Sequence, residues 1–187
     1  MNVPASVKDR ERIRLFCALR LPEETTKEVV AWQGRAFSGE RDVRVLSPQQ
    51  LHVTLAFLGH RRVEELEAIA GALREAAERA EPPLLSVRRY RETRSVGMLA
   101  FADQDGRAAA LAGDLHGRLE ALCVYQRERR EWLPHVTVVR FRRPPRLDPP
   151  LPDLAPFAPS DAAVYLSRLR SSGAQYDILE SVALGGR

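Results

Sequence analysis

Two short segments of the sequence share the pattern of a histidine, a hydrophobic residue, a threonine and another hydrophobic residue. The first is His52-Val53-Thr54-Leu55 and the second is His135-Val136-Thr137-Val138, and 83 positions separate the two histidines. Imidazole is the side chain best suited to general acid–base catalysis near neutral pH, since its unperturbed pKa is about 6.5. A threonine hydroxyl donates a hydrogen bond to a phosphate oxygen without adding charge. Each segment therefore offers one proton-transfer group and one neutral donor.

Both segments are expected to form β-strands, over 51–58 and 134–141, because they are short and rich in β-branched and aliphatic residues. Side chains two positions apart on a strand point to the same face, so the histidine and threonine of each motif project together. The hydrophobic residues then face the core. Because the motif recurs after nearly half of the chain, we expect two βαβ-type halves related by a pseudo-twofold axis, with the motif strands side by side.

Two such pairs facing each other can open a cyclic phosphodiester. One histidine activates a water molecule and the other protonates the departing sugar oxygen, so the chemistry needs no metal. A single His-X-Thr segment more often satisfies a hydrogen bond in a sheet, but two copies in matching strands favour catalysis. The other histidines, His60 and His116, have no carboxylate or cysteine at metal-ligand spacing. We therefore expect no metal site and no cofactor.

The rest of the sequence alternates between predicted strands and helices. Strands rich in β-branched and aliphatic residues are expected at 13–19, 84–90, 96–102, 162–169 and 176–184. Helix-start signals and apolar residues at three- and four-residue steps predict helices over 22–37, 62–80 and 106–122. This order predicts an α+β fold with two mainly antiparallel sheets flanked by helices. Residues 1–187 are expected to form a single domain of two pseudo-symmetric lobes, with the active-site cleft between them.

Finer features of these elements follow from the same patterns. The third helix is expected to carry one apolar stripe, formed by Leu111, Leu115, Leu119 and Leu122. The Pro-rich segment 143–159 is expected to be a loop, because proline removes backbone donors and resists regular structure. Cys17 and Cys123 lie in apolar stretches without metal-ligand or redox-motif spacing, so both are expected to be buried thiols.

The composition indicates a folded protein with a modest excess of positive charge. Hydrophobic residues make up 44% and charged residues 29% of the 187 residues, and the net charge is +4. The excess favours an anionic partner. No run reaches the length of about 18 apolar residues that spans a bilayer, and the first residues lack the apolar core of a signal peptide. A cytoplasmic location and no membrane partner are therefore expected. The protein is also expected to be a monomer.

The paired motifs resemble those of the two-histidine (2H) phosphoesterase superfamily. The wider context resembles its group of RNA 2′,3′-cyclic phosphodiesterases, known as ThpR/LigT or 2′-5′ RNA ligases. Segments at both ends and in the middle of the chain carry the resemblance, namely Arg14–Leu19 with Pro22, Leu46–Gly59, Trp132–Phe141, and Leu166–Leu169 with Gly173–Tyr176. The resemblance implies metal-independent hydrolysis of an RNA terminal 2′,3′-cyclic phosphate to a 2′-phosphomonoester. The expected partners are RNA ends or nucleotides that carry a cyclic phosphate.

The resemblance also assigns roles to single residues. His52 and His135 correspond to the catalytic pair, and Thr54 and Thr137 to the residues that bind nonbridging phosphate oxygens. The fifth residue after each histidine differs between the motifs, because Phe57 corresponds to a residue that stacks on a base and Arg140 to one that contacts phosphate. An offset of five is odd, so both side chains need a β-bulge or a strand end to face the pocket. Otherwise Phe57 belongs to the core.

Three questions remain open at the level of sequence. Arg130 corresponds to a basic position that often precedes the second motif, which makes it a candidate for substrate binding. His52 is assigned as the acid that protonates O3′ and His135 as the base that activates water. Two alternatives to hydrolysis remain: ligation of RNA ends through a 2′-5′ bond, which reverses the same chemistry, and a noncatalytic RNA- or nucleotide-binding module. Retention of both histidines and both threonines argues against the binding module.

Overall fold

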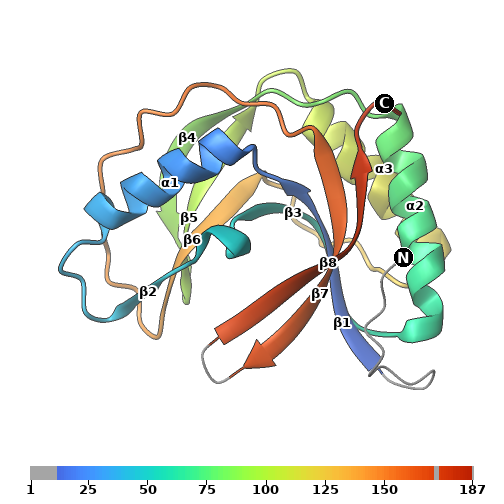
Figure 1. Ribbon diagram of the computed structural model, residues 1–187, viewed down its shortest axis with the longest axis horizontal. Helices are drawn as coiled ribbons and strands as arrows, with labels where there is room; N and C mark the ends of the chain where they lie inside the picture. Colours follow the sequence, from blue (N-terminus) through green and yellow to red (C-terminus); the bar gives the residue numbers. More distant parts are fainter. Residues whose placement is uncertain (1–11, 171–172, 187) are drawn as a thin grey trace.

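A curled antiparallel sheet forms the centre of the protein, whose computed structural model describes residues 12–170 and 173–186 (Figure 1). Within these residues the sheet has eight strands, and every pairing between them is antiparallel. The strand order across the sheet is β4 (Leu85–Glu92), β5 (Val96–Asp103), β6 (His135–Phe141), β3 (His52–Arg62), β1 (Arg12–Arg20), β7 (Asp161–Arg170), β8 (Gly173–Ala183). The short strand β2 (Val43–Val45) lies outside this order and pairs with β6. The predicted α+β class with antiparallel strands is confirmed.

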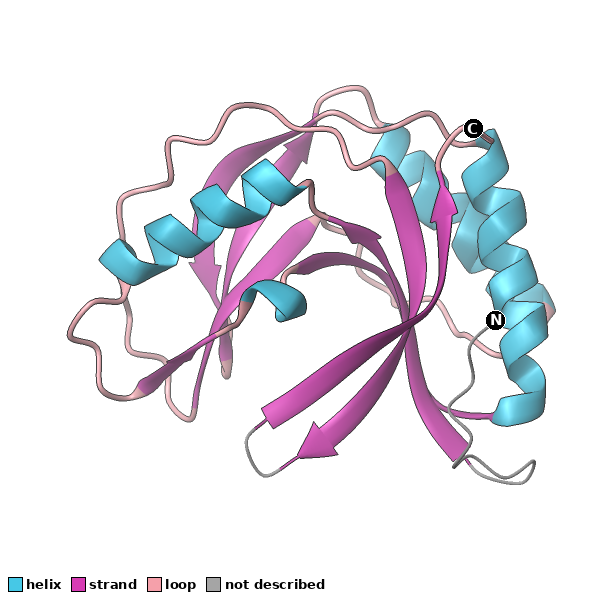
Figure 2. Cartoon of the chain, viewed as in Figure 1, coloured by secondary structure: helices cyan, strands magenta, loops and turns pink. Residues whose placement is uncertain are grey.

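The helices of the described residues lie against the sheet from two sides (Figure 2). They are α1 (Glu23–Ala36), α2 (Leu66–Arg79) and α3 (Arg107–Ala121), with short 3₁₀ turns at Pro48–Gln50 and Val63–Glu65. α1 lies over the part of the sheet formed by β4, β5 and β6, whereas α2 and α3 lie together against the part formed by β3, β1, β7 and β8 (Figure 1). Each part of the sheet is therefore covered mainly by different helices, although α3 also contacts β5.

The two parts of the sheet meet where the two motifs lie. β3 and β6 pair at Val53 and Val136, the residues that directly follow the two motif histidines. The expected side-by-side placement of the motif strands is confirmed. The two expected sheets are thereby joined into one continuous sheet. Within the described residues, the pairing of β3 with β6 is its shortest, since it has a single residue pair in register. In an antiparallel register about this pair, each motif histidine lies toward the threonine of the other motif.

The core lies between the sheet and the helices and follows the predicted periodicity with two exceptions. Leu111, Leu115 and Leu119 are buried as expected, but Leu122 is 41% exposed, because α3 ends at Ala121 and the chain turns there. Cys17 is buried, and burial raises the pKa of its thiol to about 12. Cys123 was expected to be buried and is instead exposed. It lies in the turn after α3 with φ of 57°, so the apolar context in the sequence was misleading.

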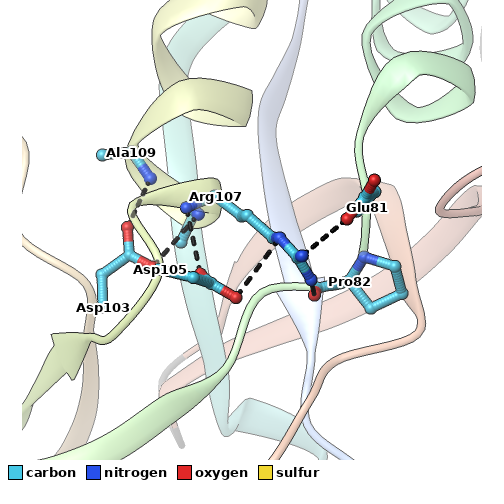
Figure 3. A network of polar contacts seen from close by, with 7 residues as sticks. Glu81, Pro82, Asp103, Asp105, Arg107 and Ala109 are labelled. Carbon is cyan, nitrogen blue, oxygen red and sulfur yellow. Dashed lines mark hydrogen bonds and ion pairs between the residues drawn. The ribbon is translucent and has the colours of Figure 1, made fainter.

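The start of α3 is held by side chains that replace the missing partners of its first N–H groups (Figure 3). Asp103, the last residue of β5, accepts hydrogen bonds from the N–H groups of Ala108 and Ala109, at 3.3 and 2.8 Å. Arg107 forms an ion pair with Glu81 at 2.7 Å, which ties the helix to the segment that follows α2. These contacts fix the orientation of α3 against the sheet.

Most predicted boundaries agree with the structure to within a few residues. β2 was missed because it has only three residues, two of which are exposed, and its pairing with β6 is long-range. The segment 143–159 is a loop as expected, apart from one isolated bridge between Phe157 and Leu85.

Among the helices of the described residues, none has the length and apolar character that crossing a membrane requires.

Candidate active site

A pocket of about 330 Å³ opens beside the junction of β3 and β6. Its lining includes His52 and Thr54 of the first motif, Thr137 of the second, and the fifth-position residues Phe57 and Arg140. The hydrophobic motif residues are fully buried or nearly so on the other face. Strand alternation therefore separates the groups that could do chemistry from the groups that anchor them, as the sequence predicted.

His135 lies on the same face of β6 as Thr137, although it is not among the residues that line this pocket. The imidazole is half-buried, and its Nδ1 lies 2.8 Å from the carbonyl oxygen of Leu133. Because a carbonyl only accepts, Nδ1 carries the hydrogen and donates it. The neutral ring then has its lone pair on Nε2, which is the arrangement that a base requires. When His135 is protonated, its charge disfavours protonation of His52, so the two imidazoles are close enough to interact electrostatically.

A β-bulge in each motif strand solves the problem of the odd offset. In β3, Thr54 pairs with Ala18 and Ala56 with Cys17, so Leu55 is an extra residue in the strand. The extra residue shifts the alternation by one position, so that Leu55 and Ala56 are both buried while Phe57 is 50% exposed. The core interpretation of Phe57 is therefore wrong, and the side chain lines the pocket.

The second motif strand has its bulge at the equivalent position. In β6, Thr137 pairs with Met98 and Val139 with Gly97, which leaves Val138 as the extra residue. Val138 and Val139 are both buried, and Arg140 is exposed and lines the pocket. Of the two possibilities that the sequence left open, a β-bulge or a strand end, the structure has the bulge at both motifs.

His52 is surrounded by aromatic rings that the sequence did not assign to the site. Its ring centroid lies 4.7 Å from that of Phe16, 5.6 Å from that of Tyr165 and 5.3 Å from that of Tyr176. Burial among these groups lowers the pKa of His52 to about 4, and the charges of His135 and Arg140 act in the same direction. The unbound protein therefore holds His52 neutral at neutral pH.

The Nδ1 atom of His52 is less well held than that of His135. The carbonyl of Gln50, which corresponds to Leu133 in the other motif, opposes the lowering of the His52 pKa. Nδ1 is nevertheless buried and makes no hydrogen bond of normal geometry within the described part of the chain. The two imidazoles therefore occupy equivalent positions on their strands, but only that of His135 has its Nδ1 held by a hydrogen bond.

Other pocket residues come from strands β1, β7 and β8, and the sequence analysis missed their roles. The guanidinium carbon of Arg14 lies 4.8 Å from the ring centroid of Phe57, a cation–π distance. Ser167 and Tyr176 line the pocket from the other side of β1. Strand alternation in β1 places Arg14 and Phe16 on the same face, and the sequence could have indicated this. Only the pairing of β1 with β3 shows that this face is the one that lines the pocket.

Arg130 does not lie in the pocket. Its side chain is 80% exposed and forms an ion pair with Glu128 at 2.5 Å. Its role in substrate binding was expected from its place before the second motif, and that role stays a prediction.

A larger, arginine-lined groove of about 1030 Å³ adjoins the pocket. It shares Arg44 and Arg140 with the pocket and adds Arg41, Arg142 and Arg143. Asp42 is the single acidic residue among those that line it. The groove therefore extends positive charge from the pocket along β2 and the end of β6.

No group of three or more histidine, cysteine, aspartate or glutamate side chains gathers closely enough to hold a metal ion anywhere in residues 12–170 and 173–186. The pocket is lined by the imidazole of His52, the hydroxyls of Thr54 and Thr137, and guanidinium groups that include those of Arg14 and Arg140. A curled antiparallel sheet that brings two His-X-Thr strands side by side defines the two-histidine class of phosphoesterases.

Comparisons with known proteins place the chain within this class. Residues 19–95 match the family described as LigT like Phosphoesterase. A relative from Thermus thermophilus, described as an RNA 2′,3′-cyclic phosphodiesterase, is 33% identical over 186 residues, covering 93% of this chain and 91% of the relative. The chain therefore belongs to the family of LigT-like phosphoesterases.

Solved structures agree with this assignment at the level of the fold. A crystal structure of a protein from Thermus thermophilus has a TM-score of 0.80 at 29% identity, covering 93% of this chain and 99% of that chain. The structure of Escherichia coli LigT complexed with 3′-AMP has a TM-score of 0.77 at 24% identity, with the same coverage.

Proposed function

We propose that this protein hydrolyses an RNA terminal 2′,3′-cyclic phosphate to a 2′-phosphomonoester by metal-independent acid–base catalysis. The observation that carries the proposal is the junction of β3 and β6, where the two His-X-Thr motifs meet beside a pocket that also holds Phe57 and Arg140. The activity named for the Thermus thermophilus relative supports the same reaction.

The reaction needs one proton acceptor and one proton donor on opposite sides of phosphorus. His135, whose Nδ1 donates to Leu133, offers Nε2 as the base that takes a proton from water. The water oxygen bonds to phosphorus, the bond from phosphorus to O3′ breaks, and His52 gives its proton to O3′. The hydroxyls of Thr54 and Thr137 donate to the nonbridging oxygens, and Arg140 offsets the negative charge.

The acid role of His52 requires a proton that the unbound protein does not hold at neutral pH, since its pKa is about 4. An anionic phosphodiester beside the ring favours the charged imidazolium and raises this pKa. We propose that His52 takes up its proton as the substrate binds. Calorimetric titration with a 2′-nucleotide at pH 6, in buffers of different ionisation enthalpy, tests this step. Because the phosphate monoester itself titrates near pH 6, His52→Gln is titrated in parallel. Uptake of more protons by the wild type than by His52→Gln is expected, and equal uptake by the two proteins contradicts the acid role.

The arginine-lined groove favours RNA ends over free nucleotides. An oligonucleotide extends beyond the pocket, and its phosphates have a path along Arg142 and Arg143. Contacts of this kind weaken as salt screens them. We therefore expect a higher kcat/KM for a cyclic-phosphate oligonucleotide than for a cyclic mononucleotide, with the advantage shrinking as salt is raised.

The experiment incubates the protein with both substrates in EDTA and follows loss of the cyclic phosphate. Turnover in EDTA is expected. Complete loss of activity that a divalent metal restores contradicts the metal-free mechanism. The addition of an RNA with a free 5′-hydroxyl tests the ligase alternative, which predicts a 2′-5′-linked product. Binding of both substrates without turnover would identify a noncatalytic module, and the two proton-transfer groups argue against that outcome.

A further inference from the structure

Two buried polar side chains on helices occupy equivalent positions in the two halves of the chain. Gln33 of α1 is 1% exposed, and His116 of α3 is 4% exposed. They are 83 positions apart, the same separation as between the motif histidines. Buried polar side chains are found where they satisfy a hydrogen bond that the surrounding structure needs.

Each of these side chains contacts the extra residue of one β-bulge. The Nε2 of Gln33 donates to the carbonyl oxygen of Val138 at 2.7 Å, and also to that of Leu46 at 3.2 Å. The Nε2 of His116 lies 2.8 Å from the carbonyl oxygen of Leu55, so it carries the hydrogen and donates. A bulge leaves its extra residue outside the regular ladder, and a buried carbonyl without a partner is unfavourable.

The contacts cross between the halves. Gln33 precedes the first motif and binds the bulge of the second, whereas His116 precedes the second motif and binds the bulge of the first. This exchange follows from the fold, since α1 covers β6 and α3 packs against β3 (Figure 1). The carbonyl of Val138 has a second donor, the N–H of Leu46 at 3.0 Å, so the β6 bulge is held twice.

We propose that Gln33 and His116 are positioning residues that stabilise the two bulges and thereby direct Arg140 and Phe57 into the pocket. Two positions separate Leu55 from Phe57 and Val138 from Arg140, so the bulge decides which face the fifth-position side chain occupies. Without the bulge, strand alternation turns Phe57 and Arg140 to the face opposite the motif histidines. The assignment of what Phe57 and Arg140 then bind rests on the function proposed above.

The equivalence of the two positions supplies matched variants. Gln33→Met and His116→Met keep a long side chain and remove the donor, whereas His116→Gln replaces the imidazole by the amide that does the same work in the other half. We expect His116→Met to raise KM for a cyclic-phosphate oligonucleotide about tenfold with a smaller change in kcat, and His116→Gln to restore most of the loss. Because the Leu46 N–H also holds the β6 bulge, Gln33→Met is expected to have the smaller effect.

A double-mutant cycle separates positioning from general destabilisation. If His116 acts through Phe57, then adding His116→Met to Phe57→Ala raises KM by less than twofold, because the group being positioned is already absent. If the increase in KM of the double variant equals the product of the increases in the two single variants, the proposal is contradicted. A KM of His116→Met within twofold of the wild-type value also contradicts it. Rates are measured below the melting temperature of each variant, so a loss of stability does not enter the comparison.

A structural measurement keeps the positioning role testable if the proposed reaction fails. Crystal structures of His116→Met and His116→Gln report the conformation of β3 whether or not the protein turns over any substrate. A displaced Leu55 bulge with Phe57 out of the pocket in His116→Met, and both in place in His116→Gln, is the expected result. An unchanged bulge and an unchanged Phe57 in His116→Met contradict the proposal.

Discussion

The two motif strands have the same local geometry, and their surroundings differ. Each strand has a histidine and a threonine on one face, a bulge three positions after the histidine, and a redirected side chain at position five. His52 lies among the rings of Phe16, Tyr165 and Tyr176, and its pKa is lowered to about 4. His135 is held through Nδ1 by a backbone carbonyl. The repeated geometry places the groups, and the unequal surroundings are the basis of the different roles proposed for the two histidines.

Removal of either imidazole tests the shared geometry and is expected to have the largest effect. His52→Ala and His135→Ala should each lower kcat by about 10²–10⁴-fold, as expected for loss of one acid–base group. His60→Ala is the matched control, since His60 is an exposed residue of the same strand as His52. Steady-state rates at matched folded fractions provide the comparison. Near wild-type turnover in either folded variant contradicts the two-histidine mechanism.

The lowered pKa of His52 predicts a difference in stability between acidic and neutral pH. Between pH 6.5 and about 4 the unfolded chain protonates this imidazole and the folded protein does not. The unfolded state therefore binds more protons, and the free energy of unfolding falls as the pH falls through this range, by up to about 3 kcal/mol from His52 alone.

His52→Gln removes this titration while keeping a polar side chain of similar length. The free energy of unfolding of the variant, measured by denaturant titration at several pH values, should fall less steeply than that of the wild type. Equal slopes for the two proteins would show that the aromatic surroundings do not shift the pKa of His52. The pH dependence of the free energy of unfolding of His135→Gln is measured in the same way, as the equivalent substitution in the other motif.

Substitution at position five tests the chemical difference between the motifs. If Phe57 stacks on a base, Phe57→Ala should raise KM for RNA ends by an amount equivalent to about 1–3 kcal/mol. Phe57→Trp should retain affinity, since it keeps a flat aromatic face. The side chain is 50% exposed, so the melting temperature should change little. A folding defect in place of the KM effect would show that Phe57 supports the strand more than the substrate.

The sequence could predict features that depend on local pattern. The alternation in each motif, the apolar stripes of the helices and the proline-rich loop all follow from residues that are near each other in the chain. The internal repetition indicated the junction of β3 and β6. The odd offset of Phe57 and Arg140 indicated that either a β-bulge or a strand end must redirect these side chains.

Long-range pairing explains most of what the sequence analysis missed. The aromatic surroundings of His52 come from β1, β7 and β8, whose faces are set by register across three strands. The role of His116 could not be predicted because its hydrogen-bond partner is a backbone carbonyl 61 positions away. Every residue has such a carbonyl, so no residue type in the sequence indicates the contact. Cys123 was misjudged because the chain turns at the end of α3, which exposes a residue whose sequence neighbours are apolar.

Identification of the phosphorylated product tests the central claim most directly. A cyclic-phosphate oligonucleotide is opened in EDTA, and phosphorus NMR at partial conversion distinguishes the two possible monoesters. If Phe57 fixes the base and His52 protonates O3′, the product carries a 2′-phosphate. A predominantly 3′-phosphate product would contradict the assigned orientation of the two motifs, and an unopened cyclic phosphate would contradict the proposed reaction itself.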